Sequence, residues 1–572
     1  MYIGVRTPQQ AGGRAWQVRP FCTGFELPLV SLVAGLGMAL LIFGCGGSAP
    51  SDSTKPTQAD TTVTYQGMLT YRNDLARTGQ NLNEATLTPA NVNSTQFGKL
   101  FSYPVDGAIY AQPLYLGSVT MPSQGVRNVV YVATQHDSVY AFDADGKMSG
   151  PLWHVSFINP TAGTNSVSAA AVSDGSFPAG EIGITSTPAI DPAGSTIYVV
   201  AYTAENGQYV YRLHALDLTS GAEKFGGPVL IQASVPGTGW QNNGQGQVLF
   251  NAKGHLQRPG LLLLNGVVYV AFGSHADNYD NGGWHGWMLA YNASTLQQVA
   301  KFNTTPNGGE GAIWESGCAP AADASGNIYV ATSNGTFDAS TGGSDYGYSV
   351  LKLQPGDLTV LDWFSPSNAE NWAQTLVDLD LGSGGTMLLP DQRGPHPHLL
   401  VVAGKQGVIH LIDRDKLGHF NSVSDQIVQE LEGAILDNNL STPAYWQGNV
   451  YYASENDHLK MFSLANGLLS TSPVAKSSET FGYAGASPSV SANGSSNGIV
   501  WAIDTSAVLT GGAAVLRAYD ATNVAHELYN STLAGPRDTL GSAVKFTVPT
   551  IISGKVYVGT ASELDVLGLL PQ

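Results

Sequence analysis

Two short apolar segments joined by a tight turn recur as a pair eight times along this chain of 572 residues. The first pair, residues 128–146 (NVVYVATQHDSVYAFDADG), alternates apolar and polar residues as a half-buried strand does, and it ends in an Asp-Gly turn. The other seven pairs begin near residues 196, 266, 327, 399, 449, 498 and 555. Each unit of such a repeat buries its hydrophobic faces against its neighbours, so the pattern indicates a repeat fold built from β-strands.

Two further strand-like segments flank each pair. A short segment with a proline near its start precedes the pair, and proline is tolerated at the first residue of a strand. These prolines are Pro113, Pro188, Pro259, Pro320, Pro443, Pro488 and Pro549, with Met387 in the fifth repeat. A fourth segment follows most pairs, for example PLWHVSF at residues 151–157. Four antiparallel strands repeated radially predict an all-β fold, an eight-bladed β-propeller, with seven blades and one irregular insertion as the alternative.

The two ends of the repeat array complement each other. The last repeat ends at Leu570 without a fourth strand, whereas residues 96–103 (QFGKLFSY) look like a fourth strand without a blade of its own. We expect this N-terminal segment to complete the last blade and close the ring. Closure would bury the sheet edge that an open array exposes to aggregation.

Five connections between the expected strands are much longer than the others. They cover residues 157–183, 231–256, 274–286, 333–347 and 365–383. In a four-stranded blade, the connection between strands two and three and the connection to the next blade open on one face of the disc. All five segments are of these two kinds, so we expect them on one face. Function concentrates on loops that a rigid scaffold holds, and this face should therefore carry the site.

The N-terminal residues have the pattern of an export signal. Three arginines precede the apolar run LPLVSLVAGLGMALLIFG (residues 27–44), which ends at Cys45. Residues 42–45 (IFGC) resemble the lipobox of bacterial lipoproteins, so we interpret residues 1–44 as a signal peptide and Cys45 as the lipidated residue. Residues 45–65 are small and polar, as in a flexible tether, and residues 66–572 are assigned to a single propeller domain. An uncleaved membrane anchor is the alternative, because about 18 apolar residues can span a bilayer.

Both interpretations place the propeller outside the cytoplasm, on a cell envelope and facing the periplasm or the exterior. The net charge of the chain is −18 at pH 7, which disfavours binding to nucleic acid or to anionic lipid. We therefore expect membrane contact only through the N-terminal anchor, and we expect a monomer. Cys318 is the one cysteine after Cys45, so the domain has no internal disulfide if Cys45 is lipidated.

Five motifs follow one another in repeats three to five. They are GSHADNYDNGGWHGWMLAYN with Asp277, GGEGAIWESG with Trp314, ATSNGTF with Asn334, DLDLGSGG with Asp378 and Asp380, and AGKQGVIHLIDRDKLG with Lys405. Their order, and their approximate spacing from Trp314 to Lys405, resemble the corresponding part of the pyrroloquinoline quinone (PQQ)-dependent alcohol dehydrogenases. The repeats themselves also resemble the blades of that quinoprotein family.

The resemblance implies a role for each of these residues. Asp277, at the place of a glutamate of the family, and Asn334 would bind Ca²⁺, a hard cation that takes carboxylate and amide oxygens. Trp314 would form the floor beneath PQQ, and Lys405 would contact the quinone oxygens and stabilise their developing charge. Asp378 or Asp380 would remove the proton of the alcohol.

The sequence supports two functions. The first is an oxidoreductase that uses PQQ and Ca²⁺ to oxidise an alcohol, a polyol or a sugar, although the adjacent cysteine pair of that family is absent because Cys318 has no neighbouring cysteine. The second is a non-catalytic envelope lipoprotein that resembles the outer-membrane assembly propeller lipoprotein and holds a protein or a glycan. The enzyme requires Asp277, Asn334, one aspartate of the pair 378 and 380, and Lys405 to converge over Trp314.

Three histidines on loops of the same face form a second candidate site. His136, His275 and His285 could bind a transition metal, since imidazole suits such ions. Ordinary surface-loop histidines are the alternative.

Overall fold

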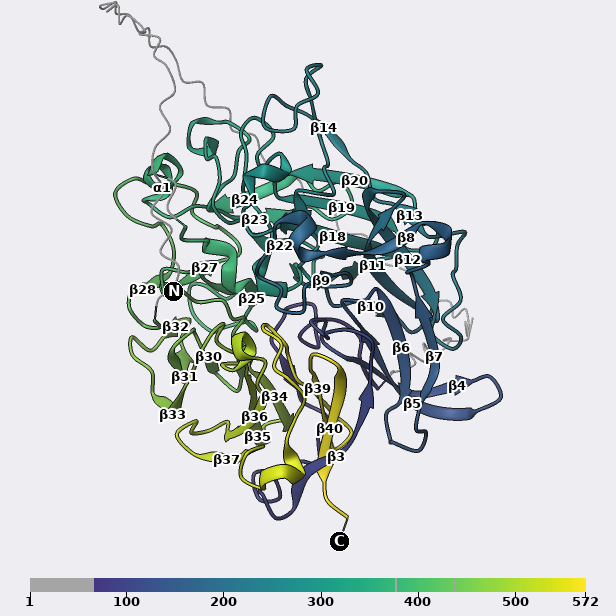
Figure 1. Cartoon of the computed structure of the whole chain (residues 1–572). Coiled ribbons are helices and arrows are strands. Elements are labelled where there is room, and N and C mark those ends of the chain that lie inside the picture. The colour runs from purple at the N-terminus through teal and green to yellow at the C-terminus, as the bar shows by residue number, and fades with distance from the viewer. Residues whose placement is uncertain (1–65, 376–377, 437, 572) are drawn as a thin grey trace, which may run out of the picture. The chain divides into compact units, whose positions relative to one another are not determined.

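The computed structural model describes residues 66–375, 378–436 and 438–571 (Figure 1). Its strands form eight blade sheets of a single β-propeller, so the predicted fold and the number of blades are confirmed. The predicted signal peptide (residues 1–44), the lipidation site Cys45 and the predicted tether (residues 45–65) lie outside the described residues. Within the described part of the chain, no helix is both long and apolar enough to cross a membrane.

The first four blades follow one another in chain order. Blade one contains β1 (Gly67–Met68), β4 (Leu114–Met121), β5 (Gly125–Ala133), β6 (Ser138–Asp143) and β7 (Pro151–Ser156). Blade two contains β10 (Ala189–Asp191), β11 (Thr196–Glu205), β12 (Gln208–Asp217) and β13 (Val229–Leu230), with β8 (Thr164–Ser168) and β9 (Glu181–Ile182) added beside β11. Blade three contains β16 (His255–Leu256), β17 (Leu262–Leu264), β18 (Val267–Ser274), β19 (Trp287–Asn292) and β20 (Gln298–Asn303). Blade four contains β21 (Ala321–Ala322), β22 (Ile328–Ala331), β23 (Val350–Leu353) and β24 (Val360–Phe364).

In the other four blades consecutive strands are again antiparallel, and blades seven and eight each add a strand from the N-terminal part of the chain, which in blade seven pairs in parallel. Blade five contains β25 (Thr386–Leu388), β26 (Leu399–Ala403), β27 (Ile409–Asp413) and β28 (Gln429–Leu431). Blade six contains β29 (Ala444–Trp446), β30 (Asn449–Tyr452), β31 (Asp457–Ala465), β32 (Leu468–Leu469) and β33 (Ala475–Phe481). Blade seven contains β2 (Gln80–Asn81), β34 (Ser489–Asn493), β35 (Ser496–Asp504), β36 (Val515–Asp520) and β37 (Glu527–Asn530). Blade eight contains β38 (Thr550–Ile552), β39 (Lys555–Gly559), β40 (Glu563–Leu569) and β3 (Phe97–Pro104).

The remaining elements lie in the connections. They are the hairpin of β14 (Ser234–Pro236) and β15 (Gln247–Leu249), the helix α1 (Ala369–Thr375), and the short 3₁₀ turns Pro160–Ala162, Ala169–Val172, Tyr279–Asn281, Glu315–Gly317, Ala339–Thr341, Leu381–Gly384, Val508–Thr510 and Gly535–Asp538. Several of the segments expected to be plain loops therefore carry local structure of their own. Local hydrogen bonds of this kind satisfy main-chain polar groups that a long loop would otherwise leave unpaired.

The ring closes as the sequence predicts. Strand β3 pairs antiparallel with β40, with Gly98 opposite Gly568, and it supplies the fourth strand of blade eight. Six of the seven predicted prolines come directly before the innermost strand of a blade, and Pro259 lies three residues before β17. A proline at this point costs no ladder hydrogen bond, because the strand has not yet begun.

Residues 67–81, which we call the plug segment, run along the inner edges of the blades. The sequence did not predict this arrangement. Carbonyl groups of the plug segment accept hydrogen bonds from the innermost strands of five blades. The pairs are Ile190 to Leu69, Ala322 to Leu75, Leu388 to Ala76, Tyr445 to Thr78 and Val490 to Gly79, at 2.7–2.9 Å. The plug segment thus satisfies the exposed inner edges of the sheets, which would otherwise be unpaired.

Two buried arginines fix the plug segment to the starts of the strands. The guanidinium of Arg72 donates to the carbonyl oxygens of Pro443 and Pro488, and that of Arg77 donates to Pro320 at 2.7 Å and 3.1 Å. The same prolines that mark the repeat therefore provide acceptors for the plug segment.

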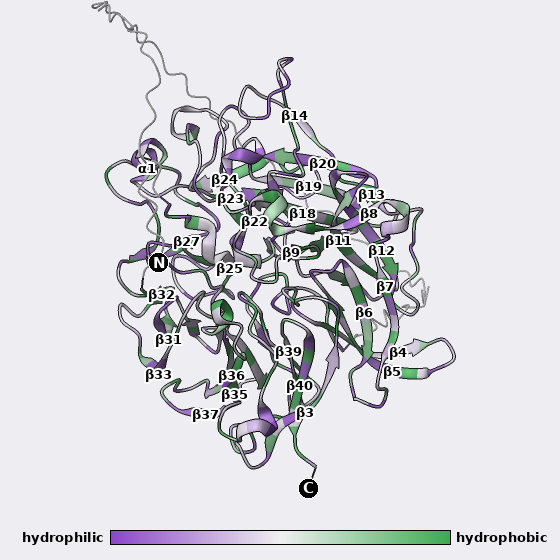
Figure 2. Cartoon of the chain, viewed as in Figure 1, coloured by the Kyte–Doolittle hydropathy of each residue, from purple (hydrophilic) through white to green (hydrophobic). Residues whose placement is uncertain are grey.

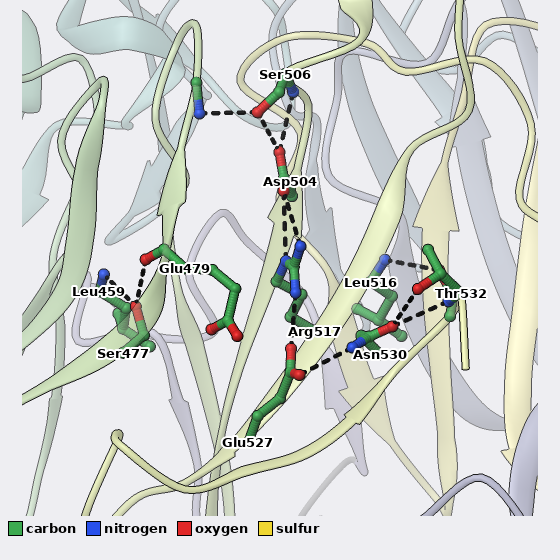
Figure 3. A network of polar contacts seen from close by, with 12 residues as sticks. Leu459, Ser477, Glu479, Asp504, Ser506, Leu516, Arg517, Glu527, Asn530 and Thr532 are labelled. Carbon is green, nitrogen blue, oxygen red and sulfur yellow. Dashed lines mark hydrogen bonds and ion pairs between the residues drawn. The ribbon is translucent and has the colours of Figure 1, made fainter.

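The hydrophobic core lies between the blades. Figure 2 shows that the strands carry most of the hydrophobic residues, whereas the connecting loops are more hydrophilic. Polar networks hold the outer strands, as Figure 3 shows for blades six and seven. There, Arg517 of β36 pairs with Glu527 of β37 at 2.8 Å and with Asp504 of β35 at 3.3 Å. The blades are thus packed by apolar side chains inside and tied by charged ones outside.

Candidate active-site cavity

A cavity of about 270 Å³ lies where connections from seven blades meet. Each of the five long segments contributes to its lining, which confirms that they open on one face. Their contributions are Asp174 from 157–183, Leu256 from 231–256, Asp277 from 274–286, Asn334 from 333–347 and Asp380 from 365–383. The rigid ring of blades therefore gathers side chains that are far apart in the sequence around one cavity.

Five of the six residues predicted for the quinone and calcium site line this cavity. They are Asp277, Trp314, Asn334, Asp380 and Lys405. The sixth, Asp378, does not line it, and its carboxyl is 59% exposed, compared with 6% for Asp380. The convergence that the enzyme requires is thus present, with Asp380 as the aspartate that faces the cavity.

Lys405 connects the two aspartates and the indole ring. Its Nζ lies 2.7 Å from Oδ1 of Asp378, 2.6 Å from Oδ2 of Asp380 and 5.9 Å from the ring centroid of Trp314. Burial would lower the pKa of Lys405, but the two carboxylates outweigh it and raise the pKa above its usual value. The lysine is therefore a fixed positive charge next to the indole ring.

Asn334 positions the segment that carries both aspartates. Its Oδ1 accepts from the main-chain N–H groups of Leu379 at 3.2 Å and Asp380 at 3.0 Å, and its Nδ2 donates to Oδ1 of Asp378 at 3.0 Å. Asp380 has a φ of 31°, a strained value for a residue with a side chain. The asparagine side chain thus holds Asp380 in a conformation that it would not otherwise prefer.

Asp277 follows β18 in a tight turn and faces the same space. The hydroxyl of Ser274 donates to its Oδ1 at 2.5 Å, and Ala276 and Asp277 both have positive φ. Burial, and then the negative charge of Asp380, raise the pKa of Asp277 to about 7. Two carboxylates that disfavour each other's charge in one cavity form an electrostatic site for a cation.

The cavity also has a second cationic end, which the sequence analysis missed. The guanidinium carbon of Arg258 lies 4.6 Å from the ring centroid of Phe546, and Nζ of Lys545 lies 5.1 Å from the same ring. Both cations are at least 95% buried, and neither forms an ion pair with a carboxylate of the described residues. Burial, and then the charge of Arg258, lower the pKa of Lys545 to about 7. The other rings around these two cations are Tyr110, Phe177 and Tyr483.

A sequence signal for this end exists in hindsight. Arg258 directly precedes Pro259, and Lys545 lies four residues before Pro549. Both cations are therefore in connections that lead to an innermost strand, and such connections open on the site face. A charged residue just ahead of a repeat proline is thus a candidate for the cavity.

The three loop histidines do not form a common metal cluster within the described residues. Each has a separate partner instead: Glu181 for His136 (2.9 Å), Asp174 for His275 (3.2 Å) and Thr305 for His285 (2.9 Å). The alternative of surface histidines is also wrong for His275 and His285, because both are buried. Their role is to join neighbouring loops by hydrogen bonds.

Solved structures of similar fold exist, although no protein-family model and no curated protein sequence matches this chain. A quinohemoprotein alcohol dehydrogenase from Comamonas testosteroni has a TM-score of 0.58 at 14% identity, covering 88% of this chain and 80% of its own. One from Pseudomonas putida HK5 has a TM-score of 0.56 at 14% identity, with the same coverage. A europium-containing methanol dehydrogenase has a TM-score of 0.57 at 13% identity, covering 88% and 98%. The chain therefore has the eight-bladed fold seen in quinoprotein alcohol dehydrogenases.

Proposed function

We propose that the protein is an exported, lipid-anchored oxidoreductase of the PQQ-repeat family, which binds PQQ and Ca²⁺ in this cavity and oxidises an alcohol, a polyol or a sugar. The observation that carries the proposal is the convergence of Asp277, Asn334, Asp380 and Lys405 beside Trp314 in one cavity. These residues come from three successive blades, so their meeting is a property of the fold and not of one local motif.

The carboxylates of the cavity fit a calcium ion. Asp277 has no lysine or arginine within ion-pair distance in the described part of the chain, and its raised pKa shows that its charge is poorly compensated. Ca²⁺ would be held by the carboxylate of Asp277, which lines the cavity. Asn334 would contribute its amide oxygen by releasing one of the two main-chain donors that it now accepts.

The rest of the lining fits a planar, anionic quinone. The indole of Trp314 offers a stacking surface, and Lys405 lies beside it. Arg258 and Lys545 supply positive charge for carboxylate groups at the other end of the cavity. Cations that are buried without a carboxylate partner are costly, and a bound anion would offset that cost.

Asp380 is the better candidate for the catalytic base. It faces the cavity, whereas Asp378 is largely exposed and lies outside the lining. Asp380 would accept the hydroxyl proton of the alcohol, and Lys405 would hold the carboxylate in place through its 2.6 Å ion pair. PQQ, when bound, would accept the hydride. The sequence contains no C-x-x-C-H haem motif, so the electrons would leave through a separate carrier.

The proposal is tested by titrating PQQ into the purified full-length chain, with Ca²⁺ or with a chelator, and following absorbance or heat. We expect saturable binding that requires Ca²⁺ and is at least about tenfold weaker in Trp314→Ala, because the stacking surface is lost. Trp363→Ala, on the outermost strand of blade four, is the matched control and should bind normally. Asp380→Asn should bind PQQ yet lose turnover. Absence of saturable binding by the wild type would contradict the proposal.

A non-catalytic glycan-binding scaffold is the second candidate, and exposed aromatic rings favour it. Trp240 and Tyr279 are 37% and 44% exposed, and both pack against Trp284, which lines the cavity. Exposed indole and phenol rings offer apolar faces together with a polar group. If the chain binds no PQQ, glycan binding that is lost in Trp240→Ala would support this function.

A further inference from the structure

A second cluster of ligating side chains lies on blade five, outside the cavity. It consists of His410 on β27, Glu430 on β28 and Asp425 in the connection between these strands. None of the three lines the cavity. We propose that His410, Asp425 and Glu430 form a binding site for one divalent transition-metal ion, of which Zn²⁺ is the representative.

The backbone brings the three ligands together. His410 and Glu430 are directly opposite each other in the antiparallel pair β27–β28, so their side chains leave the same face of the sheet. The connection returns Asp425 to that face. One ligand atom from each residue lies within 4.8 Å of the other two. Ligands of tetrahedral zinc are about 3.3 Å apart, given bonds of about 2.0 Å, and rotation of the exposed Glu430 side chain can supply the difference.

Unsatisfied polar atoms indicate that a ligand belongs here. The side chains of His410 and Asp425 are each only 2% exposed. Nδ1 of His410 and Oδ2 of Asp425 have no hydrogen-bond partner, and the nearest contact between the two side chains, from Nε2 to Oδ2, is 3.7 Å. A buried carboxylate oxygen without a partner costs free energy, and a metal ion between these atoms would remove that cost.

Within the part of the chain that the structure describes, no nearby cationic side chain compensates the two carboxylates of this cluster. No lysine or arginine of the described residues forms an ion pair with Asp425 or Glu430. The imidazole of His410 can supply one nitrogen ligand to such an ion. One nitrogen and two carboxylate oxygens are a donor set for zinc and similar first-row ions, whereas calcium prefers oxygen alone.

The position of the site gives it a structural role. Oδ1 of Asp425 accepts the main-chain N–H of Ser367 at 2.6 Å, and Ser367 lies in the connection that leaves blade four. That connection continues through α1 to Asp378 and Asp380. A metal ion would therefore fix the β27–β28 connection and, through Asp425, the start of the segment that enters the cavity.

The test is a calorimetric titration of Zn²⁺ into the full-length chain, purified without a histidine tag, stripped with a chelator and saturated with Ca²⁺ to occupy the cavity carboxylates. We expect one saturable site and a higher melting temperature with Zn²⁺. Glu430→Gln should weaken binding at least tenfold and abolish the shift in melting temperature. Since Glu430 is exposed, this variant should fold normally.

Two controls make the result decisive. Glu432→Gln changes an exposed acid two residues away and should leave Zn²⁺ binding unchanged. Co²⁺ in the same site should show the visible absorption of low-coordinate cobalt in the wild type and lose it in Asp425→Asn. Equal Zn²⁺ affinity in the wild type and Glu430→Gln, or no saturable binding in the wild type, would overturn the proposal.

Discussion

The charge state of individual residues decides what the cavity can bind. Nζ of Lys405 lies 2.6 Å from Oδ2 of Asp380 and compensates its charge. Asp277, by contrast, accepts a hydrogen bond from the hydroxyl of Ser274, and it lies near the negative charge of Asp380. Because the raised pKa of Asp277 is a folded-state property, the native protein binds this proton more tightly than the unfolded chain does. The contribution of Asp277 to stability is therefore most favourable at low pH and is lost as the pH rises towards 7.

We expect this titration to be visible in stability measurements without calcium. The melting temperature of the wild type should fall between pH 5 and pH 8, and Asp277→Asn should remove most of that slope and be about 2 kcal/mol more stable at pH 8. Added Ca²⁺ should stabilise the wild type and leave the variant unchanged. Asp280→Asn, an exposed neighbour, is the control for a general charge effect. An equal slope in the wild type and Asp277→Asn would show that the carboxyl is not perturbed.

At the scale of elements, ring closure depends on one N-terminal strand. Phe97, at the start of β3, is fully buried, and its ring lies 5.5 Å from that of Trp501 and 4.9 Å from that of Tyr529. These two residues belong to blade seven, whereas β3 pairs with β40 of blade eight. The strand therefore joins the two blades in addition to completing a sheet.

Truncation of the Phe97 side chain should destabilise the protein. Phe97→Ala should lower the free energy of unfolding by about 3–5 kcal/mol, because it removes a buried aromatic ring and leaves a cavity at the closure. Urea unfolding followed by circular dichroism measures the loss. Val299→Ala, at a half-exposed position of the outer strand β20, should change stability by less than about 1 kcal/mol. Similar losses of unfolding free energy in the two variants would show that Phe97 does not stabilise the closure of the ring.

Considered as a whole, the propeller is held at its centre as well as at its circumference. The plug segment accepts hydrogen bonds from the innermost strands of five blades, and the fully buried Arg72 donates to the carbonyl groups of Pro443 and Pro488 in two of them. In a repeat protein without a central segment of this kind, each repeat contacts only its neighbours. Here, non-adjacent blades are joined through a single segment.

We therefore expect unfolding as one cooperative transition, with fluorescence and circular dichroism curves that coincide. Arg72→Met should lower stability by about 2–4 kcal/mol, since it leaves two buried carbonyl groups without a donor. Arg393→Met, at an exposed position, is the control and should be neutral. Separate transitions in the wild type, or an unchanged midpoint in Arg72→Met, would contradict this account of the plug segment.

The sequence by itself determined the blades, the closing strand and the face on which the long loops lie. Strand alternation, turns and strand-initial prolines are local properties, so they can be recognised without knowing which segments meet in space. The resemblance of five motifs in repeats three to five to those of the PQQ-dependent alcohol dehydrogenases likewise indicated Asp277, Trp314, Asn334, Asp380 and Lys405 as site residues.

Only the tertiary structure decided which distant residues became neighbours. It excluded Asp378 from the cavity lining and placed Arg258 and Lys545 beside one ring, although they belong to the entries of blades three and eight. It also brought the plug segment to the inner sheet edges. These arrangements arise because ring closure converts a linear series of repeats into a circle, so that side chains meet across a centre that no local pattern encodes.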